Sequence, residues 1–236
     1  MRRVSCLVVC LAGCASSPVP APSTPEPSSE AVTPGPEARS ADPTERLLKT
    51  EEALGERDIR VRMTVHSDGA VDSTFVGALV MQGDRVALTA SGSFAGTPVE
   101  LSFEADGERM RGKGGAREFD LPQPPGLRDV LAVSLVRMGI LHTLAMLSAG
   151  QPPDVPEGDV RDWLVVTPQP GAPTVAVMEP FHPDLPTDPV TFRTAVAGEE
   201  SVTATVWIED SILVERQQET RFGEETMRVL EAFEPM

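Results

Sequence analysis

The sequence has no tyrosine, and its phenylalanines and tryptophans bring the aromatic content to only 4%. Aromatic side chains are the platforms on which proteins stack nucleobases and sugars, so a stacking site for either is disfavoured. Lysine is also scarce, with only Lys49 and Lys113, and the formal net charge is −16. Because binding to phosphates needs clustered cations, we expect no nucleic-acid partner.

Cysteine is absent beyond the first 14 residues, where all three lie: Cys6, Cys10 and Cys14. The body of the protein therefore has no disulfide, no thiol nucleophile and no zinc-thiolate site. The three histidines are far apart and none has a metal-binding spacing: His66, His142 and His182. The sequence also has no Gly-x-Ser-x-Gly elbow. We therefore predict no metal, no cofactor and no catalytic residue, and thus a protein that is not an enzyme.

The N-terminal segment has the layout of a secretory signal. Met1-Arg2-Arg3 is basic, residues 4–11 are apolar, and small residues precede Cys14. The run Leu11-Ala12-Gly13-Cys14 resembles the bacterial lipobox, in which the cysteine receives a diacylglycerol and, after cleavage, its amino group can be acylated. We predict a signal peptide over residues 1–13 and lipidation of Cys14, with an uncleaved or ordinary signal as the alternative. Two or three acyl chains give durable attachment, whereas one holds only marginally.

The segment after Cys14 predicts where the protein resides. Ala15-Ser16 follows the cysteine, where enteric-type lipoproteins retained in the inner membrane carry an aspartate. This resemblance implies the outer membrane, with the protein facing the periplasm. Residues 14–43 are rich in proline and serine and poor in large apolar residues, so they cannot offset the entropy of ordering. We expect a disordered tether that spans roughly 30 Å as a coil.

Residues 44–236 have the length of one domain. A helix is expected from Thr44 to about Gly55, and then alternation of apolar and polar residues predicts strands separated by short turns. The expected strands are 59–66, 75–81, 86–90, 99–105, short pieces around Met110 and Phe119, 163–167, 173–178, 190–196, 202–208, 213–220 and 226–233. The predicted class is α+β: a single antiparallel sheet of about 10–11 strands, curled into a half-open β-barrel.

Residues 126–148 form a long apolar run without proline, which predicts one helix. Nearly every side of this helix is apolar, so it is buried either in protein or in lipid. Arg137 would cost about 2.5 to 3.5 kcal/mol at mid-membrane, which the aliphatic residues could nearly offset. A transmembrane interpretation therefore stays open. Because strands precede and follow the helix, we favour its packing into the concave face of the sheet.

This order of elements resembles the fold of the Lol lipoprotein carriers and receptors (LolA and LolB) and of related mycobacterial lipid-binding lipoproteins. The resemblance rests on the leading helix, the meander through FVGALVMQGDRVALTASGSF and VELSFEADGERMRG, the apolar helix, and the closing strands ATVWIEDSILVERQQETRF and ETMRVLEAF. It implies a hollow that takes acyl chains of a lipid or an acylated lipoprotein. The family's gating arginine has no motif match here, and Arg60 and Arg62 are candidates only by their place on an early strand.

The resemblance implies a cavity lined by inward-facing apolar residues of the sheet and helix. The candidates are Val80, Leu88, Leu101, Phe103, Leu131, Leu135, Met138, Leu141, Leu144, Val206 and Ile208. Arg137 and His142 are candidates to meet a polar headgroup, or else to pair with carboxylates. We expect a monomeric, membrane-anchored lipoprotein that binds acyl chains, for transport or for sorting to the outer membrane. The alternative is a structural or assembly lipoprotein that binds a protein partner through its sheet.

Overall fold

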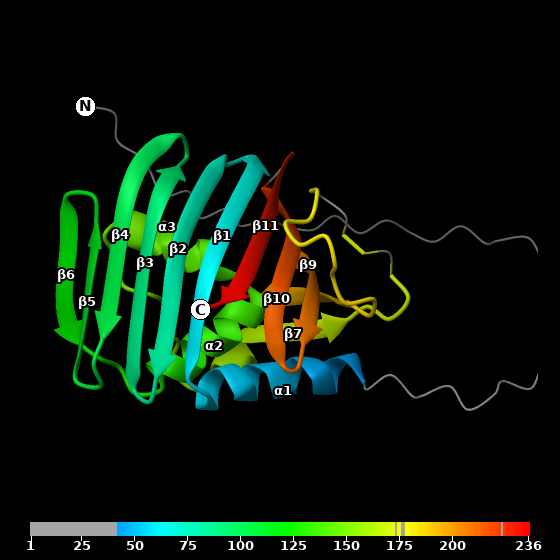
Figure 1. Cartoon of the computed structure of the whole chain (residues 1–236), viewed down its shortest axis with the longest axis horizontal. Helices are drawn as coiled ribbons and strands as arrows, with labels where there is room; N and C mark the ends of the chain where they lie inside the picture. Colours follow the sequence, from blue (N-terminus) through cyan, green and yellow to red (C-terminus); the bar gives the residue numbers. More distant parts are fainter. Residues whose placement is uncertain (1–41, 173, 176–177, 223) are drawn as a thin grey trace, which may run out of the picture. The chain divides into compact units, whose positions relative to one another are not determined.

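Alternating apolar and polar residues after the first helix produce one antiparallel sheet of eleven strands (Figure 1). The computed structural model describes residues 42–236 except 173, 176–177 and 223, and these belong to one compact unit, Ser40–Met236. The predicted signal peptide, Cys14 and the tether up to residue 41 lie outside the described residues. The predicted sheet of ten to eleven antiparallel strands is confirmed.

The sheet consists of two meanders that meet in its middle. The first contains β1 (Ile59–Gly69), β2 (Ser73–Gln82), β3 (Arg85–Phe94), β4 (Thr97–Ala105), β5 (Arg109–Gly114) and β6 (Arg117–Pro122). The second contains β7 (Leu164–Pro168), β8 (Val190–Val196), β9 (Glu199–Glu209), β10 (Ile212–Phe222) and β11 (Glu225–Pro235). β1 pairs with β11, and β6 and β7 form the two edges, so the sheet is not closed. The strand expected over 173–178 is not found among the described residues of that range.

Helices cover one side of the sheet, which we call the helix side, and the opposite side is the outer side. In β1 the odd-numbered residues from Ile59 to Val65 are buried, whereas Arg60 and Arg62 are exposed on the outer side. The same alternation continues in β2, where Leu79 and Met81 are buried. Val80 therefore lies on the outer side beside Arg60, and the prediction that it faces inward is wrong.

Helix α1 (Pro43–Glu56) lies across one end of the sheet, at the lower end in Figure 1. Asp42 caps its first turn by accepting from the Thr44 backbone N–H, and Pro43 begins the helix, one residue before the predicted start. Leu47 and Leu54 are buried against the rest of the domain. Arg128 fastens this end by donating to the carbonyls of residues 54, 57 and 83.

The predicted single helix over 126–148 is wrong, because the run is broken into two. α2 (Leu127–Arg137) and α3 (Ile140–Ser148) meet at an angle of 116°. Gly139 lies at the break with φ of +87°, a conformation that glycine adopts without strain. Within the described residues, neither helix alone is long and apolar enough to cross a membrane, and only the bent pair taken together has the required length and composition. A short helix, α4 (Val160–Trp163), precedes β7.

Candidate functional site

The break between α2 and α3 is held by two buried charged residues from the sheet. Arg216 on β10 donates from Nε to the Val136 carbonyl at 3.2 Å and from Nη2 to the Arg137 carbonyl at 3.1 Å. Glu231 on β11 accepts from the Leu141 backbone N–H at 2.9 Å. The cation thus meets the negative end of α2 and the carboxylate meets the positive end of α3, which is the favourable arrangement for both helix dipoles.

Burial opposes the ionisation of both residues. Arg216 and Glu231 are 0% exposed, and their nearest charged atoms, Nη1 and Oε2, lie 4.0 Å apart. Burial lowers the pKa of Arg216 to about 10, against the attraction of Glu231. Burial raises the pKa of Glu231, and Arg216 together with the N–H groups of residues 140 and 141 counteracts this. The pair therefore depends on its hydrogen bonds to the helix ends, so we name Arg216 and Glu231 the helix-break clamp.

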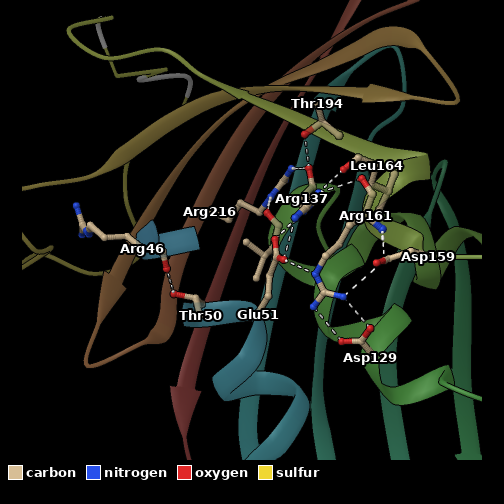
Figure 2. A network of polar contacts seen from close by, with 11 residues as sticks. Arg46, Thr50, Glu51, Asp129, Arg137, Asp159, Arg161, Leu164, Thr194 and Arg216 are labelled. Carbon is tan, nitrogen blue, oxygen red and sulfur yellow. Dashed lines mark hydrogen bonds and ion pairs between the residues drawn. The ribbon is translucent and has the colours of Figure 1, made fainter. Parts of the chain in front are cut away.

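A second buried network joins α1, α2 and α4 (Figure 2). Arg137 donates from Nε and Nη2 to the two carboxylate oxygens of Glu51, at 2.6 and 2.9 Å. Arg161 reaches the same carboxylate at 3.3 Å and binds Asp129 through two further hydrogen bonds. Because Arg137 is 4% exposed and occupied by Glu51, it fastens the helices together and is not placed to meet a headgroup. It takes the alternative role that the sequence left open, pairing with a carboxylate.

An apolar cavity of about 400 Å³ lies beside α3, at the end of the sheet away from α1. Its walls come from the start of α3 and from the ends of strands at four hairpins. Its lining residues are Val71, Phe94, Met138, Leu141, His142, Ala145, Val196, Val202, Gln218, Thr220 and Met227. Six of the apolar ones, among them Phe94, Met138 and Met227, are only half-buried, so the cavity opens to solvent.

Three polar side chains line this cavity. His142 lies at its edge, and its Nε2 is 3.2 Å from Oδ2 of Asp154. Gln218 and Thr220 come from β10 and are 4% and 8% exposed. Being two residues apart on a strand, they face the same side of the sheet, the helix side.

The structure separates the predicted site residues into three groups. Met138, Leu141 and His142 line the cavity. Seven others are buried in the hydrophobic core: Leu88, Leu101, Phe103, Leu131, Leu135, Leu144 and Val206. Ile208 is partly buried and packs against this core. Val80 is on the outer side, away from both. Sequence reasoning missed the lining residues near the hairpins, whose only signal was an apolar residue beside a turn, as at Val71 and Val196.

The described residues thus define an open antiparallel sheet with an apolar, solvent-connected cavity at one end. No protein-family model matches the chain, and no curated protein matches it. Among solved structures, the chain is similar to LprF from Mycobacterium bovis, with a TM-score of 0.36 and 12% identity over 83% of this chain and 92% of that chain. A similarity at this level assigns neither fold nor function.

Proposed function

We propose that this protein is a non-catalytic, lipid-binding lipoprotein that shelters an acyl chain in the cavity beside α3. The observation that carries the proposal is the cavity lining, in which eight of the eleven residues are apolar. Sites for small ligands are typically concave and mostly apolar, with a few polar groups that orient the ligand. The cavity beside α3, with eight apolar and three polar lining residues, matches this description.

The size of the cavity favours one chain. The cavity has a volume of about 400 Å³. A methylene group is about as large as a water molecule, whose share of the liquid is about 30 Å³, so the cavity has room for roughly a dozen carbons. Each methylene moved out of water contributes about 0.8 kcal/mol, so a chain of this length would bind without strong polar recognition. A lipid with several chains would leave the others outside.

The cellular role in this proposal rests on the sequence of the N-terminal segment. The lipobox at residues 11–14 supports acylation of Cys14, and the proline-rich tether would hold the domain clear of the membrane. Ala15-Ser16 supports an outer-membrane location facing the periplasm. In this proposal a monomer takes the acyl chain of a lipid or lipoprotein for transport or sorting, with the sheet curling around α2 and α3 to form the hollow.

The side chains in the cavity wall bear on the non-catalytic part of the proposal. Among the described residues, the only hydroxyl in the cavity lining is Thr220 Oγ1, and it has no hydrogen-bond partner, whereas an activated nucleophile needs a base within hydrogen-bonding distance.

The proposal is tested with the full chain carrying Cys14→Ser, which removes the predicted acyl anchor. We expect native mass spectrometry to find one molecule of monolauroylglycerol bound per protein after incubation. Ala145→Trp fills the cavity and should abolish the complex. Val76→Trp is the matched control, since Val76 is 55% exposed on the outer side of β2, and it should bind as the parent does.

Two results would contradict the proposal. Equal binding by the Ala145→Trp and Val76→Trp variants would place the lipid elsewhere, and an absence of binding by the parent would reject lipid binding. Release of free laurate during the incubation would overturn the non-catalytic part.

A further inference from the structure

Methionine is the only sulfur-containing residue of the domain, because all three cysteines lie within the first 14 residues. The methionines of the domain are Met63, Met81, Met110, Met138, Met146, Met178, Met227 and Met236. Peroxides oxidise a methionine thioether to a sulfoxide, which turns an apolar side chain into a polar one. Oxidation of sulfur within the domain therefore falls on these side chains.

Burial separates a sealed group of methionines from an accessible pair. Met63, Met81 and Met110 are buried in the hydrophobic core. Met138 and Met227 are half-buried and line the cavity beside α3, which opens to solvent. Met138 directly follows α2 at the helix break, whereas Met227 lies on β11, so the two side chains belong to different walls. A small oxidant that enters the opening therefore meets methionine on two sides.

A sulfoxide at either position opposes the binding of an acyl chain. Most of the cavity lining is apolar, so in the empty cavity the oxygen of a sulfoxide is hydrated by water. An acyl chain that fills the cavity displaces this water and leaves a polar oxygen against hydrocarbon, which is unfavourable. The thioether carries no such cost, because methionine packs adaptably against apolar groups. The oxidation state of these two side chains therefore sets the affinity of the cavity.

Building on the proposed function, we infer that Met138 and Met227 form an oxidation site at which peroxide lowers the affinity of the cavity for acyl chains. In each oxidation the O–O bond of hydrogen peroxide breaks, one oxygen atom forms the S–O bond of the sulfoxide, and water leaves. The sulfur loses two electrons and the peroxide gains them. An acyl chain already in the cavity covers both side chains, so the loaded protein resists oxidation at these two positions and the empty protein does not.

The first test measures protection by a bound chain, using the full chain with its three cysteines replaced by serine. The protein is treated with hydrogen peroxide with and without monolauroylglycerol, and peptide mass spectrometry follows the sulfoxide at each methionine. At a free lipid concentration about ten times the dissociation constant, about a tenth of the protein stays empty, so oxidation of Met138 and Met227 should slow about tenfold. Met146 and Met178 are half-buried outside the cavity lining, and their oxidation should not change.

The second test measures the affinity of the oxidised protein by titration calorimetry, after peroxide has been removed. We expect the parent to bind monolauroylglycerol about tenfold more weakly once oxidised. Met138→Leu combined with Met227→Leu keeps the size and apolar character of both side chains, so this variant should keep its affinity after the same treatment. Met146→Leu combined with Met178→Leu is the matched control and should lose affinity as the parent does.

Three results would overturn the inference while lipid binding stands. They are oxidation of Met138 and Met227 at the same rate with and without lipid, an oxidised parent that binds as tightly as the untreated one, and equal losses of affinity in the two double variants. The protection measurement needs only the parent, so it decides the matter even where a variant fails to fold. Failure of the untreated parent to bind monolauroylglycerol would reject the proposed function itself.

Discussion

The two ends of the sheet differ in how their charged and apolar side chains are arranged. At the end covered by α1, the buried carboxylate of Glu51 is satisfied by two hydrogen bonds from Arg137 and an ion pair with Arg161. At the other end, apolar side chains such as Phe94 and Met138 are half-buried, and the buried hydroxyl of Thr220 has no partner within the described part of the chain.

This contrast separates the part of the domain that holds the fold together from the part available for binding. A network in which every member is satisfied makes its surroundings rigid, whereas exposed apolar surface and unpaired polar groups reduce stability. Binding sites commonly carry such local costs, which the rest of the structure must offset. The clamp of Arg216 and Glu231 holds the break at which the chain changes direction between α2 and α3.

The largest expected effect comes from removing the cation of the clamp. Arg216→Met leaves Glu231 buried without its counter-ion and removes the donor of the Val136 carbonyl, while the Arg137 carbonyl keeps the Thr194 hydroxyl. We expect the free energy of unfolding, measured with urea, to fall by about 3–5 kcal/mol. Adding Glu231→Gln, which removes the buried charge and keeps an acceptor for the Leu141 N–H, should restore part of the loss. A cost below about 1 kcal/mol for the single variant would show that the two ends are stable without the clamp.

The second prediction concerns the space at the helix break. A Cβ on Gly139 would lie 2.5 Å from both carboxylate oxygens of Glu231 and 2.7 Å from Nη1 of Arg216, in a backbone with φ of +87°. Gly139→Ala should therefore destabilise the protein by about 3 kcal/mol in the same urea experiment, combining backbone strain with displacement of the clamp.

Gly126, at the start of α2, is the matched control. Its φ is +72°, but a methyl group on its Cα would have no neighbouring atom within 4 Å. Gly126→Ala should cost only the backbone strain, about 1 kcal/mol. Equal losses of stability for the two substitutions would show that Arg216 and Glu231 move aside for the methyl group at no cost. The break at Gly139 would then be no more constrained than the turn at Gly126.

Local patterns were sufficient to predict most of the sheet. The alternation of residues 59–66 places one row of side chains inside, and short turns join neighbouring strands antiparallel. The break at Gly139 was not predictable in this way, because it depends on Arg216 and Glu231, which lie about 80 to 90 residues further along the chain. A glycine inside an apolar helical run was its only local signal.

The site was less predictable than the fold. In β2 the residues from Phe75 to Met81 are almost all apolar, so a period of two does not tell which row faces inward, and Val80 was placed on the wrong side. Leu88 and Leu101 do face the helix side, but whether a side chain lines a void or fills the core depends on what packs opposite it. That information is in the tertiary structure and not in the pattern of either strand.

The smallest predicted effect compares two buried threonines on neighbouring strands. Thr205, 0% exposed on β9, accepts from the Val175 N–H at 3.0 Å and shares a hydrogen bond with the hydroxyl of Thr191. Thr205→Val should therefore cost about 1–2 kcal/mol, because it leaves those partners unpaired. Thr220→Val removes a buried hydroxyl for which residues 42–236, leaving aside the four that are not described, provide no partner, and it should raise the free energy of unfolding by about 1 kcal/mol. Opposite signs for the same substitution would show that the Thr220 hydroxyl lowers the stability of the domain; a loss at Thr220 equal to that at Thr205 would mean that its hydroxyl is already satisfied.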